Sequence, residues 1–384
     1  MSVFTVFFCG TASTRYDAHN PNYPNGELVA TLAHNCLGRE FADWVIIDGP
    51  GSGNLQEDQL WEEPGGYYSV KGTLFGAGWE ENVAHALALT KGKANWKRQQ
   101  LTEQEYNILK NADIPIQDAK AIGSFFWRQY DYGKRIVTPQ DLQEQIIRMF
   151  RKGQRIPEQV NLVGWSRGGI SCHMMANAMA GDPELKHIPV NIFAIDPVPG
   201  PANFQKHRTG IGANVREYVA FYARDERSKG FACVIPENTA HTRMHIFPMA
   251  GRHATLVGNG AIDGDVGRQR CLEPGIIVRH VAETCLTRWG VSLSNKLLLT
   301  NRKLEDAYAA LSADEDLYVQ MQASVYTIQE SIGENKDRYV SHGNKGIAFH
   351  DVHGNAFYTT DGLSARIGPD NVIPLLEQQP AHAG

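Results

Sequence analysis

The chain has 384 residues, of which 42% are apolar and 21% are charged, and its formal net charge at pH 7 is −5. This length suits one large α/β domain with additions, or two ordinary domains, and the composition is that of a globular protein. The small negative charge excludes a general attraction to nucleic acid or to anionic lipid headgroups. No stretch approaches the roughly 20 apolar residues of a membrane-spanning helix.

The N-terminal sequence MSVFTVFFCG lacks the basic segment and the long apolar run of a secretory signal peptide. We therefore expect synthesis in the cytoplasm and, for an exported protein, a route other than the general secretory pathway. The six cysteines are scattered and form no C-x-x-C pair. This spacing indicates reduced core thiols rather than a disulfide framework or a zinc site.

Short apolar runs predict six β-strands, and helical patterns lie between several of them. Strands that alternate with helices form a mostly parallel sheet covered on both faces, so we predict an α/β fold. The predicted strands are 3–9, 44–48, 160–163, 190–195, 218–222 and 244–247.

Three further segments have a distinct character. A helix is predicted over 138–153, with Thr138 as its N-cap and Gly153 at its end. Residues 49–78 are rich in glycine and predict a long surface excursion after the second strand. Beyond about residue 293 apolar residues recur at helical spacing, so residues 294–384 are predicted to form a helical extension that ends in a tail.

The segment VNLVGWSRGGISCHMM, residues 160–175, runs from a strand pattern through a glycine turn into a helix. A G-x-S-x-G pattern is weak on its own, but this context is that of a nucleophile elbow, in which Ser166 adopts a strained conformation at the carboxyl edge of a sheet. The N–H of Arg167 would then donate to a developing oxyanion, a contact worth about 3 kcal/mol. The alternative is an ordinary serine in a glycine-rich turn.

A serine nucleophile requires a histidine base and usually an acid, in the order serine, acid, histidine for this class of fold. Asp196 follows the next predicted strand and is the favoured acid, although an aspartate before a proline commonly caps a turn. Asp225, in the segment FYARDERSKGF, is the alternative acid. The competing interpretation of that segment is a solvated cluster of ion pairs.

His253 is the favoured base because it follows a predicted strand and comes after both candidate acids. His241 and His245 are interpreted as structural histidines. His350 and His353 are interpreted as part of a polar loop, and we expect no metal site.

Several motifs together resemble the α/β-hydrolase domain family that includes the type VI secretion phospholipase effectors. The family's DGT turn corresponds to CGT at residues 9–11, its glycine-rich segment to GPGSGN and GTLFGAGWEENVAHALAL, and its GFSRGA elbow to GWSRGG. Its later motifs correspond to Asp196, to DERSKGF, to FPMAGRH ending at His253, and to a closing helix with the sequence IVRHVAETCLTRWGVSL. The resemblance spans about residues 3 to 293. The chain departs from it in having Cys9 for an aspartate and HATLVG for HSDVGGG.

The resemblance implies an α/β-hydrolase catalytic domain over 1–293 and ester hydrolysis through an acyl-enzyme, with Ser166, Asp196 and His253 as the triad. The oxyanion would be held by the N–H of Arg167 and by an N–H near Gly10 and Thr11. The implied substrate is a phospholipid or another lipid ester at a membrane surface. No metal or organic cofactor is needed, and an immunity protein or a component of the secretion apparatus is the implied protein partner.

Two other functions remain open from the sequence. One is an esterase for small molecules with no lipid role, and the other is a non-catalytic binding protein with the same fold. The glycine-rich segment 49–78 also contains Trp61 and Tyr67, which suit a lipid–water boundary and suggest a cover over the site. The competing interpretation is that these side chains pack the loop onto the sheet.

Overall fold

The computed structural model describes residues 2–50, 79–93, 156–228, 230–237, 241–263 and 267–323, with shorter segments at 120–122, 129–131, 147–148, 150–151, 331–332, 337–343 and 345–348. Its strands are β1 (Val3–Phe8), β2 (Trp44–Ile47), β3 (Lys120–Ile122), β4 (Gln129–Asp131), β5 (Gln159–Trp165), β6 (Val190–Ile195), β7 (Val215–Ala223), β8 (Cys233–Ile235), β9 (Arg243–Met249), β10 (Ser331–Ile332), β11 (Asp337–His342) and β12 (Lys345–Ala348). Its helices are η1 (Arg15–His19), α1 (Leu28–His34), α4 (Trp79–Thr90), α7 (Arg167–Gly181), α8 (Lys206–Thr209), η2 (Thr255–Val257), α9 (Glu273–Arg288), α10 (Asn301–Ala313) and α11 (Glu315–Ala323).

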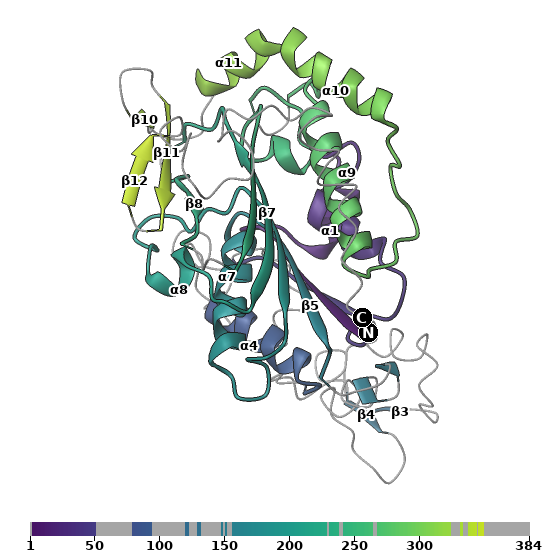
Figure 1. The fold of residues 1–384 in the computed structure, drawn as a ribbon. Helices are drawn as coiled ribbons and strands as arrows, with labels where there is room; N and C mark the ends of the chain where they lie inside the picture. Colours follow the sequence, from purple (N-terminus) through teal and green to yellow (C-terminus); the bar gives the residue numbers. More distant parts are fainter. Residues whose placement is uncertain are drawn as a thin grey trace.

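The central sheet has six strands, all parallel, in the order β2-β1-β5-β6-β7-β9. Each of the six strands predicted from the sequence lies in this sheet, and no observed end differs from the predicted one by more than three residues. Helices flank the sheet, with α4 and α7 against one face and α1 and α9 against the other (Figure 1). The prediction of an α/β fold with a mostly parallel sheet is therefore confirmed.

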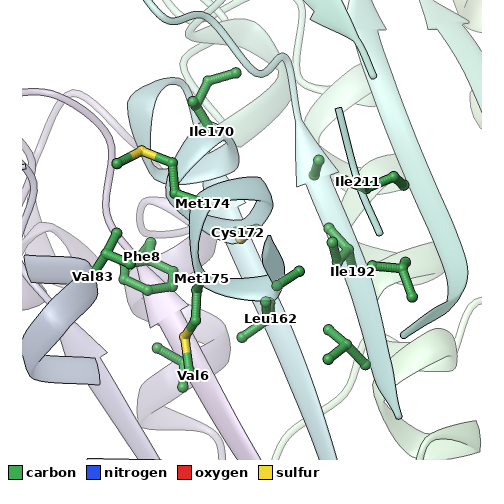
Figure 2. Close-up of a cluster of buried hydrophobic side chains, with 14 of the residues drawn as sticks. Val6, Phe8, Val83, Leu162, Ile170, Cys172, Met174, Met175, Ile192 and Ile211 are labelled. Carbon is green, nitrogen blue, oxygen red and sulfur yellow. The ribbon is translucent and has the colours of Figure 1, made fainter. Parts of the chain in front are cut away.

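Both faces of the sheet are buried, because alternate side chains of each strand enter two different cores. In β1, Phe4 and Phe8 belong to the core that includes α4 and α7, whereas Phe7 belongs to the core with α1 and α9. Figure 2 shows the first of these cores, with Met174 and Met175 of α7 among side chains of the strands. This double burial explains why the strands read as continuous apolar runs.

The strand order reverses direction at β1. The chain passes from β1 to β2 on one side and then returns to β5 on the other, where Phe8 pairs with Gly164. In open parallel sheets, ligands bind beyond the carboxyl ends of the strands at such a reversal. The loop after β1 and the turn after β5, which contain the candidate residues Thr11 and Ser166, leave the sheet at this point.

The segment after residue 293 differs from its prediction. The expected helices are present as α10 and α11, but the short strands β10, β11 and β12 follow them, and β11 pairs with β8 in parallel. β11 and β12 pair as an antiparallel hairpin, and Gly343, the first residue after β11, has a φ of +57°. A glycine in that position is typical of a tight hairpin, and this local signal identifies the strands that helical periodicity alone misses.

Some predictions fall outside the described residues. The possible cover at 49–78 lies outside them except for its first two residues, and so do His350, His353 and most of the helix predicted at 138–153. The six cysteines are all described, and each is buried as a free thiol, as expected. Over the described ranges no helix is both long and apolar enough to cross a membrane.

Candidate active site

Ser166 occupies the turn between β5 and α7, with φ 59° and ψ −126°. This conformation is strained for a residue with a side chain and is found mainly where the surrounding structure enforces it. The flanking glycines allow the strand and the helix to come that close: a Cβ on Gly164 would lie 2.2 Å from the carbonyl oxygen of Gly168, and a Cβ on Gly168 would lie 2.1 Å from that of Phe8. The turn therefore has the geometry that the sequence predicts for a nucleophile elbow.

Hydrogen bonds to the neighbouring strand end hold this turn in place. The Ser166 N–H donates to the carbonyl oxygen of Ile195 over 3.0 Å, and the Val198 N–H donates to the carbonyl oxygen of Ser166 over 3.2 Å. The Ser166 side chain lies at the N-terminus of α7 and makes no capping hydrogen bond there. The hydroxyl is thus held at the positive end of a helix dipole without being used by the helix.

Asp196 follows β6 and is fully buried, and its φ of 41° is also positive. Its Oδ2 lies 2.6 Å from Nδ1 of His253, and its Oδ1 accepts a 3.0 Å hydrogen bond from the Ala223 N–H. The Arg338 guanidinium completes the carboxylate's contacts with bonds of 2.6 Å to Oδ1 and 2.9 Å to Oδ2. Burial alone would raise the pKa of Asp196, but Arg338 and His253 outweigh it and lower the pKa to about 2.

His253 lies in the loop after β9, between two aromatic rings. The Trp165 ring centroid is 5.1 Å from that of the imidazole at a tilt of 33°, and the Phe231 ring meets the imidazole edge-on at the same distance. Because Nδ1 is bonded to Asp196, Nε2 is the ring nitrogen that could accept a proton, as a catalytic base requires. Within the described residues, no hydrogen bond joins His253 to Ser166, and such bonds are often completed only when substrate binds.

The candidate oxyanion donors are linked through the Arg167 side chain. Its Nη1 donates to Thr11 Oγ1 over 3.0 Å, and its Nε donates to the carbonyl oxygen of Pro199 over 3.3 Å. This side chain therefore connects the elbow to the loop after β1 and to the loop after β6. Gly10 lies against the elbow, since a Cβ there would be 2.5 Å from the Trp165 ring. The structure thus brings Gly10, Thr11 and Arg167 together beside Ser166.

Asp225, the alternative acid, makes different contacts. Its Oδ2 accepts a 2.8 Å hydrogen bond from the Gly251 N–H, and its Oδ1 accepts one of 2.8 Å from Gln322. The structure records no hydrogen bond between Asp225 and His253, so the geometry favours Asp196 as the partner of the histidine. Asp225 instead supports the loop that carries His253, from two residues away.

The rest of the DER segment also supports this loop. Glu226 accepts a 3.2 Å hydrogen bond from the His253 N–H and a 2.7 Å bond from the Ser228 N–H. Burial would raise the pKa of Glu226, but these surroundings, with Arg252 nearby, lower it. Asp225, Glu226 and Arg227 are buried, whereas Arg224 is partly exposed and pairs with Asp225 and with Glu315, so the segment is a largely buried cluster rather than a solvated one.

His241 and His245 lie near the start of β9, away from the candidate site at its carboxyl end. His241 is exposed, and His245 pairs with the buried carboxylate of Glu217, with 3.3 Å between Nε2 and Oε1. Across the described part of the chain, no group of three potential metal ligands lies close enough to hold an ion.

Sequence reasoning missed Arg338 and the role of Glu226. Arg338 is 1% exposed and lies 142 positions after Asp196, in a segment with no motif of its own. No local pattern could have paired these two residues. Glu226 lies within a motif that was recognised, so its contact with the histidine loop could have been anticipated.

No family model matches the chain, and no curated protein matches it either. Among solved structures, an uncharacterized protein from Pseudomonas aeruginosa is similar to it with a TM-score of 0.44 and 14% identity, over 84% of this chain and 50% of that one. The Tle1 effector bound to the VgrG spike from the Type 6 secretion system is similar with a TM-score of 0.30 and 11% identity, over 67% of this chain and 50% of that one. The matched regions thus span half of each of these solved chains.

Proposed function

We propose that the chain is a serine hydrolase with an α/β-hydrolase fold that cleaves carboxylic esters through an acyl-enzyme. The observation that carries this proposal is the strained position of Ser166 at the N-terminus of α7, with the hydrogen-bonded pair of Asp196 and His253 at the adjoining strand ends. The Trp165 ring links the two parts, because it precedes the serine and packs on the imidazole. This arrangement supports a catalytic role for Ser166 over that of an ordinary serine in a glycine-rich turn.

In the first half of the reaction, His253 Nε2 accepts the Ser166 proton as Oγ attacks the ester carbonyl carbon. The oxyanion is stabilised by the N–H of Arg167 and by an N–H of Gly10 or Thr11. Asp196 keeps the proton on Nδ1 and stabilises the imidazolium. The C–O bond to the alcohol then breaks, and Nε2 returns the proton to the leaving alkoxide.

In the second half, His253 Nε2 takes a proton from water, which attacks the acyl carbon. Collapse of the second tetrahedral intermediate releases the carboxylic acid and returns the proton to Ser166. Each step uses only groups of this chain and water. No metal or organic cofactor enters the proposed reaction.

The sequence motifs support a lipid ester, in particular a phospholipid, as the substrate within this proposal. The same resemblance supports delivery by a route other than the general secretory pathway, and contact with an immunity protein or with the secretion apparatus. The competing functions are hydrolysis of small soluble esters and ligand binding without catalysis. Substrate tests separate these three.

The test compares the wild-type protein with Ser166→Ala, His253→Ala and the double variant on short- and long-chain nitrophenyl esters and on phospholipid vesicles. Because triad members act as a unit, each single variant should lose at least about 10⁴-fold in kcat, and the double variant little more. Ser171→Ala is a matched control in the same helix: its hydroxyl accepts from Trp79 Nε1 over 2.6 Å and donates over 3.0 Å to the carbonyl oxygen of Arg167, not to the N–H proposed as the oxyanion donor. This control should keep its turnover.

The substrate pattern then decides the function. Release of fatty acid from vesicles supports a lipase, whereas activity confined to short soluble esters identifies a small-molecule esterase. Turnover by Ser166→Ala close to that of the wild type would contradict the assignment of the nucleophile. A folded wild-type protein without activity on any of these esters would favour the binding protein.

A further inference from the structure

Arg338 is a fully buried charge beside the proposed triad, and it comes from the segment after the predicted catalytic domain. It lies on β11, which reaches the site by pairing with β8, where Val340 is opposite Cys233. Burial alone would lower the pKa of Arg338, but Asp196 and Glu226 raise it, so the guanidinium remains charged.

The guanidinium holds several parts of the site at once. Besides both oxygens of Asp196, it donates to the carbonyl oxygen of Ala223 over 2.6 Å and to that of Phe231 over 2.9 Å. The Ala223 N–H itself donates to Asp196, and the Phe231 ring packs on the imidazole of His253. The Arg338 side chain therefore holds the Asp196 carboxylate, the end of β7 at Ala223, and Phe231, whose ring contacts the imidazole of His253.

We infer that Arg338 is a positioning residue of the hydrolase, which orients the Asp196 carboxylate and sets the pH range over which the Asp196–His253 pair is active. This inference rests on the proposed function, because it assigns a role within the same site. The planar guanidinium suits it, since two parallel hydrogen bonds fix a carboxylate in both direction and plane.

The electrostatic part of the inference has a definite sign. A serine hydrolase needs a neutral imidazole to accept the serine proton, and a fixed positive charge beside the pair disfavours the imidazolium. Removing the charge of Arg338 would favour protonation of the pair and move the acid limb of the pH–rate profile to higher pH. Because the two groups are coupled, this limb describes the pair rather than either residue alone.

The other charges around the pair do not replace Arg338. Glu226 faces the His253 backbone, and its charge is offset by Arg252, with 3.8 Å between Arg252 Nε and Glu226 Oε2. The Cys233 thiol stays neutral at working pH, because burial raises its pKa to about 12. Arg338 is thus the positive charge that contacts the Asp196 carboxylate directly.

The structure offers a matched control at the opposite end of the same strands. There Glu217 of β7 pairs with His245 of β9, and Arg288 of α9 donates to Glu217 Oε1 over 2.6 Å. This trio has the same chemical groups as Asp196, His253 and Arg338, but it is far along the strands from the elbow. Arg288→Gln removes a buried arginine–carboxylate contact without touching the proposed site.

The experiment measures kcat/KM for a soluble ester between pH 5 and 9 for the wild type, Arg338→Lys, Arg338→Gln and Arg288→Gln, with a thermal unfolding curve for each. Arg338→Gln should move the acid limb upward by about one pH unit, the order of shift that one nearby buried charge produces. Arg338→Lys should leave the acid limb of the pH–rate profile in place, because lysine retains the positive charge. Its kcat should nevertheless fall about tenfold, because lysine cannot make the two parallel hydrogen bonds that orient the Asp196 carboxylate. Arg288→Gln should lower thermal stability without moving the limb.

Several results would overturn the inference. They are an unmoved acid limb in folded Arg338→Gln, an equal shift in Arg288→Gln, or wild-type kcat in Arg338→Lys. If Arg338→Gln does not fold, Arg338→Lys still tests the inference. A kcat about tenfold below that of the wild type with an unmoved acid limb supports it, and a wild-type kcat overturns it. Failure of the proposed function would appear separately, as a wild-type protein that hydrolyses no ester.

Discussion

Two residues without the freedom of glycine adopt positive φ angles at neighbouring strand ends, Ser166 after β5 and Asp196 after β6. Each such conformation costs on the order of 1–3 kcal/mol and persists only where its surroundings enforce it. Here the Ser166 N–H bonds to Ile195 and the Asp196 N–H bonds to Phe221 over 2.7 Å, so each turn is tied to the next strand. Strain at two adjacent strand ends, with a histidine between aromatic rings beside them, is the residue-scale support for the proposed catalytic site.

The two candidate acids lead to opposite expectations. Asp196→Asn should lower kcat by about 10⁴-fold, because an amide favours the wrong tautomer of His253. Asp225→Asn should keep most of its turnover, because Asp225 binds the Gly251 N–H and Gln322 rather than the imidazole. Steady-state kinetics on a soluble ester, with thermal unfolding as a check on folding, measures both, and a reversed order would assign the acid to Asp225.

The sequence predicts these residues unevenly. Ser166 has a local motif, and Asp196 and His253 follow from strand ends and chain order, so the sequence alone suggests the three residues that the structure places at adjoining strand ends. Arg338 depends on a strand pairing between β8 and β11 that joins distant parts of the chain, and no short-range pattern encodes that pairing. In the last segment, helical periodicity predicts α10 and α11, whereas Gly343 is the residue that indicates the β11–β12 hairpin.

At the scale of elements, α7 packs unusually close to β1 and β5. Gly164 and Gly168 leave no space for a Cβ against backbone carbonyl oxygens, so this contact cannot relax by moving a flexible side chain. The close approach places the N-terminus of the helix, with its first backbone N–H groups, at the strand ends where the proposed oxyanion would form.

Gly168→Ala should therefore lower the free energy of unfolding by about 1–3 kcal/mol and displace the start of α7, with loss of activity. Gly181→Ala, at the last residue of the same helix, is the control, because a Cβ there meets nothing within 4 Å. That substitution should be neutral or stabilise the protein by up to about 1 kcal/mol. Urea denaturation measures both changes, and equal effects would contradict the close-packing account.

The N-cap of α1 introduces a pH dependence. Glu27 accepts hydrogen bonds from the N–H groups of Val29 and Ala30 over 3.0 and 2.8 Å. Burial raises the pKa of Glu27 to about 7 and outweighs these two hydrogen bonds, which lower the pKa. Asp17 makes a smaller contribution in the same direction as burial. A raised folded-state pKa contributes stability that is fully present below the unfolded value, near 4.5, and is lost as pH rises through about 7.

Glu27→Gln should remove this contribution. The free energy of unfolding of the wild type should fall relative to that of Glu27→Gln between pH 5 and pH 8, since only the wild type must bury a charge at the higher pH. Urea denaturation at the two pH values measures the difference between the proteins, in which contributions from other groups cancel. The raised pKa of Glu27 would be contradicted if the difference between the two free energies of unfolding were the same at both pH values, or if it favoured the wild type more at pH 8.

At the scale of the whole molecule, the site draws on nearly the full described length of the chain. The loop after β1 supplies Gly10 and Thr11, the strand ends of β5, β6 and β9 supply the three residues of the proposed triad, and β11 supplies Arg338. Residues beyond 293 are therefore part of the candidate site through Arg338, although the sequence resemblance ends there.

The sequence of the glycine-rich segment 49–78 leads to a prediction about how substrate reaches the site. If Trp61 and Tyr67 help to cover the site at a lipid surface, the double variant Trp61→Ala, Tyr67→Ala should lose far more activity on phospholipid vesicles than on a short soluble ester. Parallel assays on the two substrates measure this ratio. Equal losses, or a fall in thermal stability that explains them, would support simple packing of the loop instead.

The most direct test of the account is covalent capture of the nucleophile. A fluorophosphonate, which phosphonylates an activated serine, should add one adduct to the folded wild-type protein. Mass spectrometry should place it on the tryptic peptide 156–167, in which Ser166 is the only serine. Ser166→Ala should remain unlabelled, and Ser171→Ala should label like the wild type. An adduct on another residue, or none on the folded wild-type protein, would contradict the assignment of Ser166 as the nucleophile.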